Sequence, residues 1–145
     1  MRQMNVISRC ASAYKTEHGR FDEISGCHHV FFYPICKTPG LSQDALVKHT
    51  RLNKSTVTRA LAYLEEHGFV VRRQDEEDKR SMLVYPTEKM LDAFPKVKEL
   101  AADWNGMLAE GISDHELEVF RSVLAKMHDK AVMLAFGDDT EANEK

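Results

Sequence analysis

The side chains best suited to chemistry lie on one predicted helix, over residues 54–67. Val57, Ala60, Leu61 and Leu64 follow the i, i+3, i+4, i+7 spacing of a buried helical stripe. The other faces carry hydroxyl, aromatic and basic side chains, namely Lys54, Ser55, Thr56, Thr58, Arg59 and Tyr63. Hydroxyls and a lysine near a helix start can bind phosphate, and arginine suits the O6 and N7 atoms of guanine. The pattern indicates a nucleic-acid contact, although the same residues also suit a helix cap and a solvated face.

A second basic group lies on a predicted β-hairpin. Residues 69–73 and 82–85 are rich in β-forming types and flank a charged stretch, residues 74–81. Basic side chains stand at its base and near its tip, namely Arg72, Arg73, Lys79 and Arg80, where the arginines suit a narrow minor groove. The acids of residues 75–78 would be repelled by phosphate. We expect Asp78 to hold the Arg80 guanidinium by a charge-assisted hydrogen bond, while the other acids point away.

Two short helices precede the hairpin. Ser42 is a good N-cap for a helix of about two turns over residues 43–50, and Asn53 is a second N-cap. The connection of residues 51–53 is short, so the two helices must cross steeply. Helix, tight turn, helix and charged hairpin predict a winged helix-turn-helix, whose second helix enters the major groove. We include Ser42 among the candidate DNA contacts.

The sequence resembles the MarR (multiple antibiotic resistance regulator) family. The residues that carry the resemblance are Leu-Ser-Gln at 41–43, Leu46, NKSTVTR at 53–59, LEEHGFV at 64–70, DEEDKRS at 75–81 and TEK at 87–89. The resemblance implies that residues 54–67 form the recognition helix and that Asp78 and Arg80 match the family's wing motif. It also implies a homodimer joined by its first and last two helices. Such dimers bind a pseudo-palindrome, often as repressors released by a small aromatic or phenolic ligand. Pro86 and Met90 depart from the family pattern after the wing.

The ends of the chain predict long amphipathic helices. Residues 3–18 form one, ending at Gly19, and residues 88–136 form two, with a kink expected at Pro95 and a capping box at Ser113 and Glu116. Residues 24–37 predict a buried helix that Ser25 could cap and that Pro34 kinks or ends early, and residues 41–42 predict a very short strand. Apolar residues repeat in heptads on the last helix, and the candidate dimer contacts are Ile7, Phe120, Leu124, Met127 and Leu134. Packing within one monomer would give the same pattern.

Length and composition bound the domain organisation. The chain has 145 residues, of which 43% are hydrophobic, enough for one core. We expect a mainly α fold with a small β-hairpin wing, as a single domain over residues 1–136, with a winged helix over about 37–90 and dimerisation helices over about 3–18 and 88–136. Residues 137–145 predict a disordered acidic tail. No Gly-rich phosphate loop, GxSxG or HExxH motif occurs, so we expect neither an enzyme nor a cofactor.

The charge pattern and the cysteines narrow the partners. Residues 91–145 carry 12 acidic and 6 basic side chains, so a polyanion should bind through the first ninety residues. The sequence has no run of 18 apolar residues and no secretory signal, which favours the cytosol and no membrane contact. We therefore expect its 3 cysteines to be reduced thiols.

Several side chains could bind an effector. Tyr14, His28, Phe31, Phe32 and Trp104 could line a pocket for a small ligand, although they would also make an ordinary core. Cys10 lies four residues before Tyr14, and family members that sense organic hydroperoxides use a cysteine of the first helix near tyrosines. The alternatives are therefore a redox-sensing Cys10 and an inert, buried Cys10. Cys27 and Cys36 suit a core.

Two alternative hypotheses concern a metal site and a protein partner. Cys27, His28 and His29 invite a metal site, but adjacent histidines point to different sides of a helix, so we expect none. A winged helix can also serve as a protein-interaction module without binding DNA. Specific DNA binding should fall steeply with salt and disappear on Arg80→Ala or Arg59→Ala, whereas a protein-interaction module should be indifferent to both.

Overall fold

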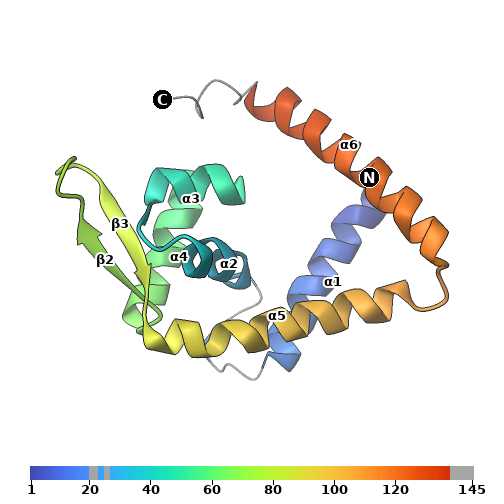
Figure 1. The fold of residues 1–145 in the computed structure, drawn as a ribbon, viewed down its shortest axis with the longest axis horizontal. Coiled ribbons are helices and arrows are strands. Elements are labelled where there is room, and N and C mark those ends of the chain that lie inside the picture. Colours follow the sequence, from blue (N-terminus) through green and yellow to red (C-terminus); the bar gives the residue numbers. More distant parts are fainter. Residues whose placement is uncertain (20–22, 25–26, 138–145) are drawn as a thin grey trace. The chain divides into compact units, whose positions relative to one another are not determined.

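The structure is a computed structural model that describes residues 1–19, 23–24 and 27–137. These residues form six helices and a small antiparallel sheet (Figure 1). In chain order the elements are α1 (Arg2–His18), α2 (His29–Lys37), β1 (Leu41–Ser42), α3 (Gln43–Thr50), α4 (Lys54–Glu66), β2 (Val70–Gln74), β3 (Met82–Pro86), α5 (Glu88–Ala109) and α6 (Asp114–Phe136). The chain forms two compact units, Met1–Asn105 and Gly106–Lys145. The predicted fold class, mainly α with a hairpin wing, is confirmed.

Side-chain caps fix the starts of α3 and α4. The Ser42 hydroxyl accepts from the Ala45 amide at 3.1 Å, and the Asn53 carboxamide oxygen accepts from the Thr56 amide at 2.8 Å. Both predicted caps are confirmed. Arg51 between the helices adopts a left-handed conformation with φ of 56°, which lets the chain reverse within three residues. The Arg51 amide donates to the Val47 carbonyl oxygen at 2.9 Å, so a backbone hydrogen bond holds the turn between the two helices.

The sheet has the strand order β1-β3-β2, and all pairings are antiparallel. Arg72 lies opposite Val84 on β3, and Leu41 of β1 pairs with Val84 from the other side. Gly40 enters this sheet with φ of 90°, and a Cβ there would meet the Tyr85 ring at 3.2 to 3.3 Å. Only glycine combines that backbone with so close an approach.

The core lies between α2, the two helices of the helix-turn-helix, the sheet and the first half of α5. Its fully buried side chains come from each of these elements and include Phe32, Ile35, Leu46, Val57, Leu61, Leu64, Phe69, Val84 and Met90. Burying one such side chain stabilises the fold by roughly 1.5 to 3 kcal/mol. The buried stripe of α4 matches the apolar spacing in the sequence, so the opposite side of this helix is available to solvent.

Helix α2 differs from its prediction. It begins at His29, and the predicted cap Ser25 lies outside the described residues. The helix does not end early at Pro34 but continues to Lys37, and the Thr38 amide donates to the Pro34 carbonyl at 2.9 Å. Proline removes only one helical hydrogen bond here, and Pro34 itself is buried. Burial of this apolar helix therefore outweighs the loss.

The terminal helices expose apolar side chains. Neither α1 nor α6 contains a buried residue, and on α6 the exposed fractions are 58% for Phe120 and 73% for Leu134. The predicted capping box of α6 is confirmed, because Ser113 and Glu116 bind each other's backbone amides. The predicted acidic tail lies outside the described residues, apart from Gly137. Among the described helices, none is long and apolar enough to cross a membrane.

Candidate nucleic-acid interface and adjoining cavity

The exposed face of α4 is narrower than the sequence suggested. Ser55, Thr58 and Arg59 are exposed, whereas Thr56 and Tyr63 are half-buried. The reason is helical geometry, because at 100° per residue positions 56 and 63 fall between the buried stripe and the outermost line. That intermediate side packs toward other helices. The candidate nucleic-acid face therefore consists of residues near the start of α4, with Arg59 as its longest basic side chain.

Polar contacts join the start of α3 to α4. Lys54 pairs with Asp44 at 2.9 Å, and both side chains are about 70% exposed (70% and 72%). An exposed pair of this kind contributes at most about 1 kcal/mol, so Lys54 can exchange Asp44 for a phosphate at small cost. The Ser55 hydroxyl donates to the Asn53 carboxamide oxygen at 2.8 Å, which also holds the cap in place.

Arg72 ties the wing to α4. Its backbone amide donates to one oxygen of the Glu65 carboxylate at 3.2 Å, and its guanidinium donates to the other from two nitrogens, Nε at 2.9 Å. The hydrogen bonds from Arg72 lower the pKa of Glu65 below its usual range. The guanidinium is thus engaged by the last turn of α4. Its neighbour Arg73 is exposed and lies over the Tyr85 ring, 5.1 Å from its centroid.

The wing tip shows what its acidic residues do. Asp75 accepts a hydrogen bond from the Glu77 amide at 3.0 Å, and Asp78 accepts from the Arg80 amide at 3.0 Å. Our expectation that Asp78 holds the Arg80 guanidinium was therefore wrong. A short aspartate side chain reaches the amide two residues ahead and closes an Asx turn, whereas the guanidinium ends a long, solvated chain. Lys79 and Arg80 remain exposed at the tip.

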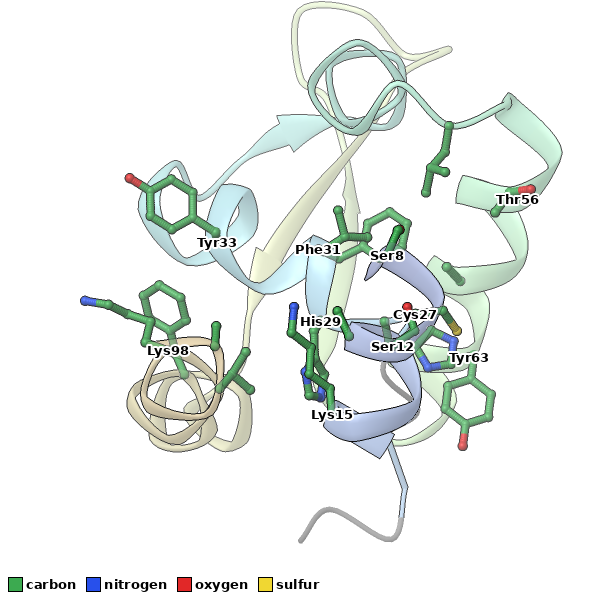
Figure 2. Close-up of a pocket in the computed structure, with 18 of the residues that line it drawn as sticks. Ser8, Ser12, Lys15, Cys27, His29, Phe31, Tyr33, Thr56, Tyr63 and Lys98 are labelled. Carbon is green, nitrogen blue, oxygen red and sulfur yellow. The ribbon is translucent and has the colours of Figure 1, made fainter. Parts of the chain in front are cut away.

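A cavity of about 830 Å³ adjoins the other side of α4. Its walls come from α1, α2, α4 and α5, and from the residues just before α2 and α4 (Figure 2). Two lysines and one arginine line it, Lys15 from α1, Arg59 from α4 and Lys98 from α5, and none of the described lining residues carries a carboxylate. The cavity is mainly apolar with a positive rim, and its size is that of a small-molecule site.

The predicted effector residues separate into three places. His28 and Phe31 line the cavity, whereas Phe32 is fully buried in the core. Tyr14 and Trp104 are not lining residues, and their rings contact each other with centroids 5.1 Å apart. Lys15 and Lys98 were not predicted from the sequence. The signal for the α1 wall was present, because Ser8, Ala11, Ser12 and Lys15 follow the spacing of one helical face.

Tyr63 connects the cavity wall to the end of α4. Its ring is stacked between the rings of His28 and His67, with centroid distances of 4.5 and 3.9 Å. Burial lowers the pKa of His28, and the positive charge that His67 can carry lowers it further. Figure 2 shows Tyr63 at the α4 side of the cavity. The residue that we expected on the nucleic-acid face thus belongs to an aromatic stack beside the cavity.

The cysteines also differ from expectation. Cys10 is exposed rather than buried, because α1 buries no side chain within the chain. Cys27 is exposed before α2 and lines the cavity, so it is not a core residue. Cys36 is half-buried against the core, and burial raises the pKa of its thiol to about 11. This thiol is protonated at neutral pH and therefore a poor nucleophile.

Comparisons with known proteins extend these observations. Residues 34–82 match the model of the MarR family. The uncharacterized HTH-type transcriptional regulator YybA of Bacillus subtilis (strain 168) is 21% identical over 127 residues, which are 88% of this chain and 85% of YybA. A MarR transcriptional regulator structure from Methanosarcina mazei Go1 is 25% identical, with a TM-score of 0.82 over 92% of this chain and 96% of that one. A putative MarR family transcriptional regulator from Listeria monocytogenes, complexed with 26mer DNA, is 21% identical, with a TM-score of 0.84 over 99% and 95%.

Two capped helices at a tight turn, followed by a sheet with a charged hairpin, define the winged helix-turn-helix class of DNA-binding proteins. The family match covers the end of α2, the helix-turn-helix and most of the hairpin. The fold agrees with MarR-family structures along nearly the whole chain. Residues 34–82 therefore match the MarR family, and the chain as a whole resembles MarR-family DNA-binding transcriptional regulators.

His29 makes the stability of this region depend on pH. It is only 6% exposed, and burial followed by the charges of Lys15 and His28 lowers its pKa to about 4. In the unfolded chain a histidine titrates near 6.5. Between these two values the unfolded chain binds more protons than the folded one, so acidification favours unfolding.

We predict that His29→Gln reduces the pH dependence of stability. Between pH 7.5 and pH 4.5 the wild type should lose about 2 to 3 kcal/mol of unfolding free energy that the variant keeps, as measured by urea denaturation at fixed protein concentration. The exposed His115 supplies a control, and His115→Gln should follow the wild type. Equal pH slopes for wild type and His29→Gln would contradict the assignment.

Proposed function

We propose that the protein is a homodimeric repressor that binds a pseudo-palindromic operator and is released by a small ligand. The observation that carries the DNA-binding proposal is the exposed start of α4, where Ser55, Thr58 and Arg59 stand free of the core. In the proposal α4 enters the major groove and Arg59 binds a guanine.

The wing and the starts of α3 and α4 are proposed to supply the remaining contacts. Lys79 and Arg80 at the exposed tip are proposed to reach the backbone and the minor groove, where a narrow groove attracts arginine. Arg73 is proposed to contact the DNA backbone, while Arg72 holds the wing on Glu65. The other proposed contacts lie at the start of α3 or in the first half of α4, and they are Ser42, Lys54, Ser55, Thr56 and Thr58. Tyr63 lies farther along α4. In this arrangement Asp78 stabilises the tip rather than touching DNA.

The proposed dimer uses the terminal helices, α1 and the region of residues 88–136, while residues 37–90 form the DNA-binding part. Large exposed apolar surfaces on a soluble chain mark interfaces. On α1, Ile7 is 46% exposed, and on α6 Phe120, Met127 and Leu134 are exposed while Leu124 is half-buried. The candidate contacts on α6 are Phe120, Leu124, Met127 and Leu134. A two-fold dimer would place two recognition helices about 34 Å apart, one turn of DNA.

The cavity supports an anionic aromatic ligand as effector. Phe31, Tyr33 and Phe94 offer aromatic walls. Three basic side chains, with no carboxylate among the described lining residues, favour a carboxylate or phenolate. Arg59 belongs to this lining and to the exposed face of α4. A ligand that binds Arg59 in the cavity would therefore compete with DNA for the same guanidinium.

We predict that Arg59→Ala and Arg80→Ala each weaken operator binding. Arg59→Ala should cost about 1 to 3 kcal/mol and relax the base preference at one position of each half-site. Arg80→Ala should weaken binding to all sequences and reduce the slope of log Kd against log salt by about one per wing. Fluorescence anisotropy with an operator selected from random duplexes measures both effects.

Arg121→Ala on α6 is the matched control, because Arg121 is an exposed arginine outside the winged helix. Its affinity and salt slope should equal those of the wild type. If the wild type holds all duplexes with the same weak affinity, and both arginine variants behave like it, a protein-interaction module replaces the DNA-binding proposal.

We predict that Phe120→Glu dissociates the dimer. A carboxylate in the centre of an apolar interface must be desolvated without a partner, which costs several kcal/mol. Sedimentation velocity at micromolar concentration should show a dimer for the wild type and a monomer for the variant. Ser122→Glu places the same charge on the other side of α6 and should remain dimeric. A wild type that sediments as a monomer would rule out the proposed assembly.

We predict that benzoate releases the operator at lower concentration than benzamide, its neutral analogue. In Lys15→Met this preference should fall about tenfold, because a charge-assisted hydrogen bond to the carboxylate is lost. Lys96→Met is the control, since Lys96 is exposed on α5 but does not line the cavity. Equal potency of the two compounds on the wild type would argue against an anion-selective site.

A further inference from the structure

One side-chain hydrogen bond crosses from α3 to α4 at the edge of the exposed face. The Gln43 carboxamide nitrogen Nε2 donates to the Thr58 hydroxyl at 2.7 Å. Gln43 is the first residue of α3, and Thr58 lies one turn inside α4. The bond therefore holds a flexible glutamine against the face that the proposed function places in the major groove.

The hydrogen-bond inventory fixes which way the amide points. The Thr58 hydroxyl donates its single hydrogen to the Lys54 carbonyl oxygen at 2.8 Å, so it can only accept from Gln43. The nitrogen of the amide must face Thr58, and the Gln43 oxygen Oε1 faces away. One N–H and the Oε1 lone pairs remain available, and neither has a hydrogen-bond partner in the described part of the chain.

The remaining donor and acceptor match one base. Adenine presents the N6 amino group as donor and N7 as acceptor in the major groove, and a glutamine binds both with Oε1 and one N–H. Because an amide nitrogen carries two hydrogens, the bond to Thr58 leaves the second one for N7. Anchoring also removes part of the side-chain entropy of the glutamine before DNA is bound.

The surroundings favour a base over a phosphate. Asp44, the next residue, is exposed and pairs with Lys54 at 2.9 Å, so this end of α3 offers little net positive charge. A neutral amide that carries a donor and an acceptor side by side gains specificity at a base edge and little at a phosphate.

We propose that Gln43 recognises an adenine in the major groove and that Thr58 is the positioning residue that orients its amide. The inference rests on the proposed function, in which α4 enters that groove. It assigns to Thr58 an indirect role, because its own hydrogen is already used within α4. It also makes the first helix of the helix-turn-helix a determinant of sequence preference.

The test compares base preferences rather than affinity alone. An operator is selected from random duplexes with the full-length wild type, and each position is then changed to all four bases and measured by fluorescence anisotropy. At one position per half-site the wild type should prefer adenine by about tenfold. Gln43→Ala should lose that preference. Gln43→Glu should shift it to cytosine, because the carboxylate accepts a hydrogen bond from the cytosine N4 amino group. Thr58→Val should reduce the adenine preference several-fold.

Ser122→Ala, on the exposed side of α6 opposite the candidate dimer contacts, is the control and should keep every preference. Unchanged preferences in both Gln43 variants, or an equal loss for all sequences, would overturn the inference. If Gln43→Ala does not fold by circular dichroism, the shift to cytosine in Gln43→Glu decides. If Arg59→Ala loses a base preference and the Gln43 variants lose none, the proposed function stands and only the role of Gln43 is rejected. A wild type without any sequence preference would reject both.

Discussion

The contact between Glu65 and Arg72 is the constraint on which the DNA-binding arrangement depends. One carboxylate at the end of α4 binds both the backbone amide and the guanidinium of a residue on β2. A charge-assisted pair of this kind is directional, so it limits how the hairpin can tilt relative to the helix. The Phe69 amide also donates to the Leu64 carbonyl oxygen at 2.8 Å where the chain leaves α4, and the Glu65–Arg72 contact adds a side-chain connection farther along β2. In the proposed DNA complex the recognition helix and the wing must keep a fixed spacing, and this contact contributes to it.

Local signals in the sequence were sufficient for most of the fold. The caps Ser42 and Asn53, the capping box of α6 and the alternating hairpin each depend on neighbours within a few residues. Such signals are visible without knowledge of tertiary structure. Pro34 shows where they fail, because the burial of α2 in the core outweighs the local preference of proline to end a helix.

The candidate site was less predictable, because its members meet across the chain. Helical periodicity correctly predicts that Tyr63 lies off the buried stripe. Its position on the cavity side follows from the tertiary contact with the His28 ring, which no local pattern predicts. Lys15 and Lys98 lie more than eighty residues apart in the sequence, and no local pattern joins them. Asp78 was misassigned for the opposite reason, since a short local bond to the Arg80 amide was overlooked in favour of a longer one.

The stacking of Tyr63 between two histidines has a thermodynamic consequence. One face of the ring contacts a residue of the cavity wall and the other contacts the residue that ends α4. Any molecule that displaces His28 to occupy the cavity must alter the environment of α4. Coupling between two binding events is reciprocal, so a ligand that lowers affinity for DNA by a given factor is itself bound more weakly by that factor when DNA is present. Cellular DNA would then set the concentration at which such a molecule is sensed.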